Sequence, residues 1–350
     1  MSKRILSYPE AINEALIQVM EKHPNSVVMG QGVDDPKRIL GTTKGLEKFG
    51  KERFFDTPIA EEGMTGVAIG MAMAETYVVH NHIRQDFLLL AMNQLINMAA
   101  KISYMYNGKV SVPLTIRACI GKSWGQGPQH SQSLYPLLMN IPGIKIVAPS
   151  NPYDAKGLLI RSFLDKNPVL FVEHRHLYYQ KGEVPEEFYD IPFKKQRWLR
   201  NYKNIMPSVT LVGISQMAVE CLRASNILKE QMNIQSHVID FRMLNPMCLD
   251  EIIESVEITR HLIFVDCAWM NNGAGSEVIT RLHEKGIRLF KMKRMGFAQT
   301  VCPTSKVLED EFYPDAYKIA KEAYGLMTSD YTWEPERNLE IEEVEFKGPF

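Results

Sequence analysis

The sequence has few cysteines, no long apolar run and almost no net charge. Its five cysteines stand apart and never form a Cys-x-x-Cys pair, which argues against structural zinc and against a disulfide framework. No window reaches the roughly 18 apolar residues of a membrane span, and the N-terminus has no apolar signal core, so we expect a soluble, cytoplasmic protein without a membrane partner. Because 40 basic residues face 41 acidic ones, no global positive charge is available to bind nucleic acid.

What the sequence does contain is an alternation of strand and helix patterns over 350 residues, a length typical of two domains. In the first half, strands are predicted over 27–30, 110–119, 144–148 and 169–173, and helices over 8–22, 63–74, 86–106 and 152–164. In the second half, strands are predicted over 209–214, 237–241, 262–265 and 289–294, and helices over 217–231, 248–255, 275–283 and 316–323. This alternation predicts an α/β fold with two open, mostly parallel sheets.

The domain boundaries follow from composition. Charged and aromatic residues crowd together between about 183 and 207 without a sustained period, so we predict one domain over 1–190 and a second, smaller one over 200–328. Residues 329–350 form an acidic tail. Such a tail is usually solvated, although its apolar residues, Trp333 among them, would allow it to dock on a neighbour.

Two adjacent carboxylates, Glu61 and Glu62, stand where a strand-like run ends and a Gly-rich helical pattern begins. A carboxyl held in a partly buried loop mouth has a raised pKa and can donate a proton to a heterocycle nitrogen. In the alternative interpretation, either glutamate only occupies the first helical turn, where the helix dipole favours negative charge. The residues by themselves leave both interpretations open.

Histidines supply the other candidates. His130 follows a Gly-rich loop that starts at Gly121, as in a mobile active-site loop, or it is an exposed bystander; the loop lacks the ending of a P-loop, which excludes an NTPase. His80 and His82 alternate as on a strand but have no third ligand at the spacing of common zinc motifs, so no metal is predicted there. The run 174–176 (His-Arg-His) ends a strand and either reaches a substrate anion or is simply solvated.

Several runs in this order resemble the beta subunits of thiamine-diphosphate-dependent 2-oxoacid dehydrogenases, of the pyruvate dehydrogenase type within the transketolase superfamily. The matching runs lie at residues 56–61 (Asp-Thr-Pro-Ile-x-Glu), 93–101, 129–132 (Gln-His-Ser-Gln), 146–159, 165–170 and 306–310. The fold that this resemblance implies is a thiamine pyrimidine-binding domain followed by a transketolase C-terminal-like domain.

The resemblance also implies roles for individual residues. Glu61, rather than Glu62, would contact N1′ of the cofactor's aminopyrimidine and so promote loss of the thiazolium C2 proton. Ile59 and Phe87 would flank the pyrimidine, and His130 would steady the intermediate or assist acyl transfer. The family's beta subunits also hold a structural potassium ion through backbone oxygens at positions that match Leu114, Ser162, Phe163, Asp165 and Asn167.

The missing part of the cofactor site implies a partner. The chain contains no Gly-Asp-Gly motif, by which thiamine-diphosphate enzymes hold Mg²⁺ and the diphosphate. In the family an alpha subunit supplies that motif, so the resemblance implies a hetero-oligomer of the α2β2 type with the cofactor at its interface. A lipoyl-bearing acyltransferase is the acceptor that the resemblance suggests.

Departures from the family pattern leave the substrate open. His82, Arg84 and Asp86 put an imidazole, a cation and an anion beside the expected pyrimidine pocket, which suggests a more polar substrate or acceptor than in central metabolism. One alternative is a split transketolase or carboligase subunit that acts on a sugar-type substrate. Another is a non-catalytic scaffold for an alpha-like protein, against which the retained Glu61 argues.

Overall fold

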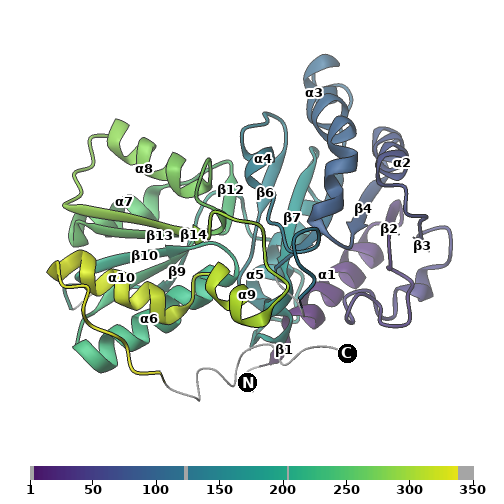
Figure 1. The fold of residues 1–350 in the computed structure, drawn as a ribbon. Helices are drawn as coiled ribbons and strands as arrows, with labels where there is room; N and C mark the ends of the chain where they lie inside the picture. The colour runs from purple at the N-terminus through teal and green to yellow at the C-terminus, as the bar shows by residue number, and fades with distance from the viewer. Residues whose placement is uncertain (1–3, 122–124, 203–204, 338–350) are drawn as a thin grey trace. The chain divides into compact units, whose positions relative to one another are not determined.

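The computed structural model describes residues 4–121, 125–202 and 205–337. The chain forms two compact units (Figure 1). Unit 1 comprises residues 1–121 and 137–193, and unit 2 comprises residues 122–136 and 194–350. The described part of the segment 122–136 thus belongs to unit 2, although the sequence analysis included it in the first domain. Among the described residues, no helix is both long enough and apolar enough to cross a membrane.

Unit 1 is built on a parallel sheet with helices on both faces. Its strands lie in the order β6 (Lys145–Val147), β7 (Val169–His174), β5 (Leu114–Ile120), β4 (Tyr77–His82), β2 (Ser26–Gly30) and β3 (Phe54–Asp56). Helices α1 (Tyr8–Lys22) and α5 (Pro152–Phe163) cover one face, and α2 (Glu61–Met73) and α3 (Ala100–Met105) cover the other (Figure 1). Both faces are covered, so the central strands β7, β5, β4 and β2 are buried over most of their length.

Short elements complete this unit. Strands β1 (Ile5–Ser7) and β8 (Lys181–Glu183) form a separate antiparallel pair. The described part of the unit also contains 3-10 helices, namely η1 (Leu46–Phe49), η2 (Gln85–Ala91) and η4 (Arg175–Tyr179). The helix η3 (Gln94–Ala99) is a π-helix. The four-residue helix α4 (Pro136–Met139) lies where the chain passes from unit 2 back to unit 1.

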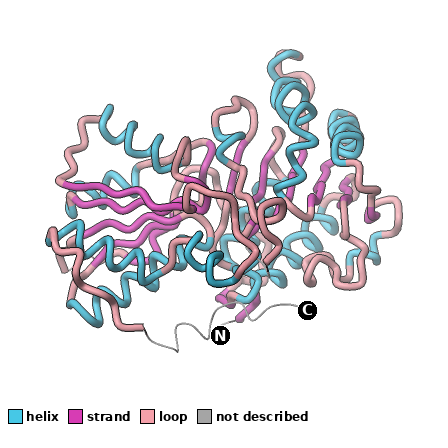
Figure 2. The backbone as a smooth tube through the Cα atoms, viewed as in Figure 1, coloured by secondary structure: helices cyan, strands magenta, loops and turns pink. Residues whose placement is uncertain are grey.

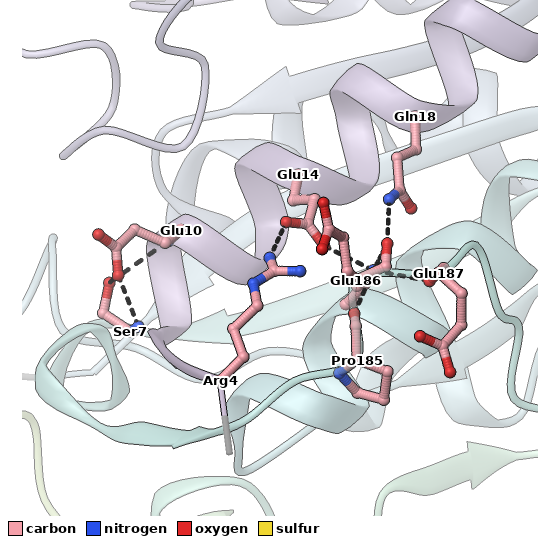
Figure 3. Close-up of polar contacts among 9 residues, drawn as sticks. Arg4, Ser7, Glu10, Glu14, Gln18, Pro185, Glu186 and Glu187 are labelled. Carbon is pink, nitrogen blue, oxygen red and sulfur yellow. Dashed lines mark hydrogen bonds and ion pairs between the residues drawn. The ribbon is translucent and has the colours of Figure 1, made fainter. Parts of the chain in front are cut away.

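A buried lysine ties α1 to α5 and to the loop at 185–187. The Lys156 side chain is fully buried, and its ammonium lies 2.6 Å from Glu14 Oε1. It also donates to the carbonyl oxygens of Pro185 at 2.7 Å and Glu187 at 2.8 Å. Arg4 pairs with the same glutamate (Figure 3). Because every donor of the buried ammonium has an acceptor, this cluster holds both helices on their face of the sheet.

The single helix expected over 86–106 is a wrong prediction. The segment is instead divided into η2, η3 and α3. In η2 the apolar residues are consecutive, so no 3.6-residue period selects one buried face. Three residues per turn place Gln85, Leu88 and Ala91 on the same side, and all three are buried. Burial of this face therefore decided the geometry that the local pattern left undefined.

Unit 2 repeats the architecture with a second sheet. Its strands lie in the order β14 (Lys291–Phe297), β13 (His261–Trp269), β10 (Val209–Gly213), β11 (Ser236–Asp240) and β9 (Arg197–Arg200), with only β9 antiparallel. Helices α6 (Gln216–Met232) and α10 (Ala316–Thr328) lie on one face, with α7 (Asp250–Thr259) and α8 (Ala274–Glu284) on the other (Figures 1 and 2). Strand β12 (Met243–Asn245) and helix α9 (Lys306–Phe312) complete the unit.

The first part of the acidic tail docks on unit 2. The ring of Trp333 lies 5.0 Å from that of Tyr324 on α10. The backbone N–H of Glu336 donates to Gln231 Oε1 of α6 at 2.9 Å, and Gln231 Nε2 donates back to the Glu336 carbonyl oxygen at 2.9 Å. Trp333 thus packs against α10, as the docking interpretation of the tail allows. Residues 338–350 lie outside the described part of the chain.

Candidate active site

The candidate site in unit 1 lies at the carboxyl edge of its parallel sheet, where ligands of open α/β sheets bind. Strand β3 ends at Asp56, and α2 begins at Glu61 on the same edge. Glu61 is only 5% exposed. Among the described residues, none donates a hydrogen bond to its carboxyl. A buried carboxyl without an internal donor can accept a hydrogen bond from, or give a proton to, a bound molecule.

Two neutral histidines pack beneath this carboxyl. The rings of His80 and His82 on β4 meet edge to face with centroids 4.4 Å apart, and His82 Nε2 lies 3.3 Å from Thr65 Oγ1, one turn after Glu61. Burial lowers the pKa of His80 to about 4, although the Glu61 charge acts in the opposite direction. Burial also holds the pKa of His82 well below its usual range. Neither ring therefore carries a charge at neutral pH that would lock Glu61 into an ion pair.

The residues expected to flank the pyrimidine belong to the same region of unit 1. Ile59 is 85% exposed and stands two residues before α2. Phe87 is half-buried in η2, which packs against α2. Exposed apolar side chains beside a buried carboxyl are what an aromatic heterocycle would need for stacking. Among the described residues, no three His, Cys, Asp or Glu side chains gather as a metal centre.

His130 belongs to unit 2 and is half-buried. The segment that carries it is fixed at its far end by Tyr135, whose fully buried hydroxyl donates to Asp266 Oδ1 at 3.4 Å. At its near end, Gly125 lies so close to Thr304 that a Cβ would come within 2.5 Å of that residue's carbonyl oxygen. His130 therefore lies on a loop held at both ends.

One buried ion pair escaped the sequence analysis. Arg117 on β5 and Glu173 on β7 pair through Nε and Oε1 at 2.6 Å, and the hydroxyl of Tyr178 donates to the same carboxylate at 2.7 Å. Both charged side chains are essentially inaccessible. The pair fixes the end of β7, where the run 174–176 leaves the sheet. The sequence does contain one sign of this pair, because Arg117 stands within an otherwise apolar strand pattern. An arginine in such a buried strand is rare unless its charge is paired.

Comparison with known proteins identifies the family. The profile described as "Transketolase, pyrimidine binding domain" matches residues 5–181, and "Transketolase, C-terminal domain" matches residues 201–319. The "2-oxoisovalerate dehydrogenase subunit beta" of Bacillus subtilis (strain 168) is 37% identical over 282 residues, covering 80% of this chain and 85% of that protein. The chain belongs to the family of 2-oxoacid dehydrogenase beta subunits.

Other relatives agree with this assignment. The "Acetoin:2,6-dichlorophenolindophenol oxidoreductase subunit beta" of Bacillus subtilis (strain 168) is 38% identical over 339 residues, covering 93% of this chain and 98% of that protein. A solved structure named "Split gene transketolase, inactive beta4 tetramer" superposes with a TM-score of 0.72 at 20% identity, covering 92% of this chain and 99% of that one, and shows the same fold. The resemblance, fold class and beta-subunit function stated from the sequence are confirmed.

The positions expected to bind potassium also come together in this beta subunit. Ser162 and Phe163 end α5, Asp165 and Asn167 follow in the next loop, and Leu114 begins the neighbouring β5. Two polar groups already engage this loop. The N–H of Asp165 donates to the Ser162 carbonyl oxygen at 3.2 Å, and Lys145 Nζ lies 2.7 Å from Asp165 Oδ1. The loop is thus a tight turn in which one carboxylate already pairs with an ammonium.

Asp266 makes the stability of this beta subunit depend on pH. Burial raises its pKa to about 7, although the N–H groups of Ala274 and Gly275 donate to it at 3.0 Å each. The folded chain therefore binds a proton that the unfolded chain releases near pH 3.8. The corresponding stability is complete below that pH and is lost as the pH rises to about 7, by up to about 4 kcal/mol.

We expect Asp266→Asn to remove this part of the pH dependence. Urea unfolding of both proteins at pH 5, 6, 7 and 8 measures this effect. The contributions of all other titrating groups cancel when the two free energies of unfolding are subtracted. The stability of the wild type relative to Asp266→Asn should fall from pH 5 to about pH 7 and level off toward pH 8. A difference that stays constant from pH 5 to 8 would show that Asp266 is ionised throughout.

Proposed function

We propose that this beta subunit completes a thiamine-diphosphate site together with an alpha subunit, and that Glu61 is the carboxyl that faces the cofactor's aminopyrimidine. The observation that supports the proposal is the Glu61 carboxyl itself, which is buried, has no internal hydrogen-bond donor among the described residues and lies near a neutral histidine, His80. These properties fit a ring nitrogen that exchanges a proton with the carboxyl.

Each candidate residue then has one task. Bound thiamine diphosphate supplies the electron sink for cleavage next to a carbonyl group. Glu61 holds or releases the proton at the pyrimidine nitrogen, while Ile59 and Phe87 flank the ring and exclude water. His130, on its anchored loop in unit 2, moves a proton at the reacting carbonyl oxygen or assists transfer of the acyl unit to an acceptor such as a lipoyl group.

The outward face of α2 supports the need for a partner. Gly63, Gly66 and Gly70 are exposed on this helix beside Val67, which is 47% exposed. Leu90 of η2, a helix that packs against α2, is 60% exposed. Exposed apolar residues grouped around a helix without bulky side chains favour close packing by another chain. We infer an α2β2 assembly in which the alpha subunits carry the Gly-Asp-Gly motif, Mg²⁺ and the diphosphate.

A potassium ion in the loop after α5 is a second part of the proposal. The backbone oxygens at Leu114, Ser162, Phe163, Asp165 and Asn167 would hold it, and hard oxygen ligands suit such a cation. Its role would be structural, because this loop lies at the amino ends of β5 and β7, away from the edge that carries Glu61.

The substrate that we propose first is a 2-oxo acid, as in the pyruvate and 2-oxoisovalerate dehydrogenase relatives. A second candidate is acetoin, an uncharged hydroxyketone, because relatives named for it in Bacillus subtilis (strain 168) and Cupriavidus necator are 38% and 36% identical to this chain. Both substrates are cleaved beside a carbonyl group, so the same cofactor chemistry serves either.

Coexpression with a candidate alpha chain that carries the Gly-Asp-Gly motif tests the proposal. We expect an α2β2 complex by native mass, stoichiometric thiamine diphosphate in the presence of Mg²⁺, and reduction of dichlorophenolindophenol by pyruvate, 2-oxoisovalerate or acetoin. Rapid acylation of a lipoyl domain by pyruvate would identify lipoyl as the acceptor and contradict the more polar acceptor suggested by Arg84 and Asp86. A complex that binds no cofactor, or that turns over none of these substrates, would overturn the proposed function.

A further inference from the structure

Arg84 is a buried cation with unused hydrogen-bonding capacity. It follows β4 directly and is only 6% exposed. One amino group donates to the Gly121 carbonyl oxygen at 3.0 Å, and Nε lies 3.4 Å from Asp86 Oδ2 without hydrogen-bond geometry. Nη1 and Nε have no hydrogen-bond partner among the described residues. A buried guanidinium with unused donors is costly unless a ligand completes its hydrogen bonds.

A second arginine lies on the next strand but one. Gly121 directly follows β5, and a Cβ on it would come within 2.7 Å of the His174 ring at the end of β7. His174 pairs with Ile120 in the sheet, so Arg175 leaves β7 next to the end of β5. Both arginines lower the pKa of the Cys119 thiol against the stronger effect of burial, which agrees with this placement. Burial lowers the pKa of Arg175, and the Arg84 charge acts in the same direction.

This cluster lies on the same sheet edge as Glu61. Thr65, one turn into α2, contacts His82, and Arg84 is two residues further along the chain. The neutral His82 contributes no charge, and Asp86 is the carboxylate that faces Arg84. The edge therefore carries a buried guanidinium with an unused donor next to the residues that would hold the cofactor's pyrimidine.

We propose that Arg84, supported by Arg175, forms a subsite at the carboxyl edge of the unit 1 sheet that binds the carboxylate of a 2-oxo acid substrate. Nη1 of Arg84 carries unused N–H groups that can donate to a carboxylate oxygen, and the guanidinium charge favours an anion there. Nε instead faces Asp86, whose Oδ2 lies 3.4 Å from it, so Asp86 holds the guanidinium in place without using Nη1. The proposal deepens the proposed function, on which it rests, because it selects an anionic substrate over an uncharged one.

The experiment uses the α2β2 complex and two readouts. Oxamate, an unreactive analogue of a 2-oxo acid, is titrated calorimetrically, and kcat/KM is measured with pyruvate, with 2-oxoisovalerate and with acetoin. For Arg84→Gln we expect oxamate to bind about 10- to 100-fold more weakly, and kcat/KM for both acids to fall by a similar factor through KM. The loss with acetoin should be much smaller. Arg84→Lys, which keeps the charge but loses the guanidinium geometry, should lie between Arg84→Gln and the wild type.

Two further variants separate this subsite from a structural role. Asp86→Asn removes the internal counter-charge and is expected to tighten oxamate binding. Arg281→Gln, an exposed arginine paired with Glu277 on α8, is the matched control and should change neither readout. Equal losses for acids and acetoin, or unchanged oxamate binding in Arg84→Gln, would overturn the subsite. A wild-type complex that binds oxamate but turns over no substrate would instead contradict the proposed function.

Discussion

Replacing Glu61 by glutamine in the α2β2 complex should lower kcat by about 10²- to 10⁴-fold, the usual contribution of a positioned general acid or base. The substitution keeps the shape of the side chain and removes the exchangeable carboxyl proton. Because no described residue donates a hydrogen bond to this carboxyl, the chain should fold and assemble normally. Steady-state turnover, together with thiamine diphosphate binding by calorimetry, measures the effect.

Glu62 provides a matched control one residue away. It is exposed and accepts a hydrogen bond from Gln94 at 3.0 Å. Glu62→Gln should therefore change stability by no more than about 0.5 kcal/mol and leave kcat within about threefold. If the complex with Glu61→Gln were as active as the wild type, the non-catalytic scaffold would become the better interpretation. If Glu62→Gln lost activity instead, the assignment of the two glutamates would have to be exchanged.

Replacing Arg117 by methionine should cost about 3 to 5 kcal/mol of stability, because it leaves the Glu173 carboxylate buried without its partner. The two side chains are 0% and 2% exposed and share two hydrogen bonds, at 2.6 and 3.0 Å. Urea unfolding measures the loss. Removing both charges, in Arg117→Met with Glu173→Gln, should recover part of it, since no unpaired charge then remains in the interior.

The matched control for this substitution is an exposed pair in the same unit. Arg161 and Asp190 lie 3.4 Å apart, with 38% and 37% of their side chains exposed. Arg161→Met should cost at most about 1 kcal/mol, because solvent screens such pairs. Equal losses for the two methionine variants would show that the Arg117 pair contributes no more than a surface pair.

Local patterns predicted regular elements well and irregular ones poorly. Helix α1 begins where Ser7 and Glu10 form a capping box, and such a cap depends on residues close in sequence. The segment 86–106 has no comparable cap and a consecutive apolar run, so its turns were decided by the surfaces of α2 and β5 against which η2 packs. Trp333 was predicted only as able to dock, because its partner Tyr324 becomes its neighbour through the fold.

The candidate site likewise has features that the sequence predicted and features that only the fold revealed. Motif order was enough to identify the family. The choice of Glu61 over Glu62 stays a prediction, which the two glutamine variants test. The neutral state of His80 was not predictable, since its pKa of about 4 results from burial by distant segments. The contact between Arg84 and the end of β5 was equally hidden, because Gly121 is far along the chain.

By itself, therefore, the sequence determined the two α/β units, the beta-subunit family and the expectation of a partner that holds the diphosphate. These features depend on periodicity, on motif order and on the missing Gly-Asp-Gly motif, all of which can be read along the chain. Only the tertiary structure decided which charges are buried, which of them are paired and which donors remain unused at the sheet edge. Burial and pairing depend on residues distant in sequence, and for the same reason the anion-binding role of Arg84 emerged only when β4, β5 and β7 were placed side by side.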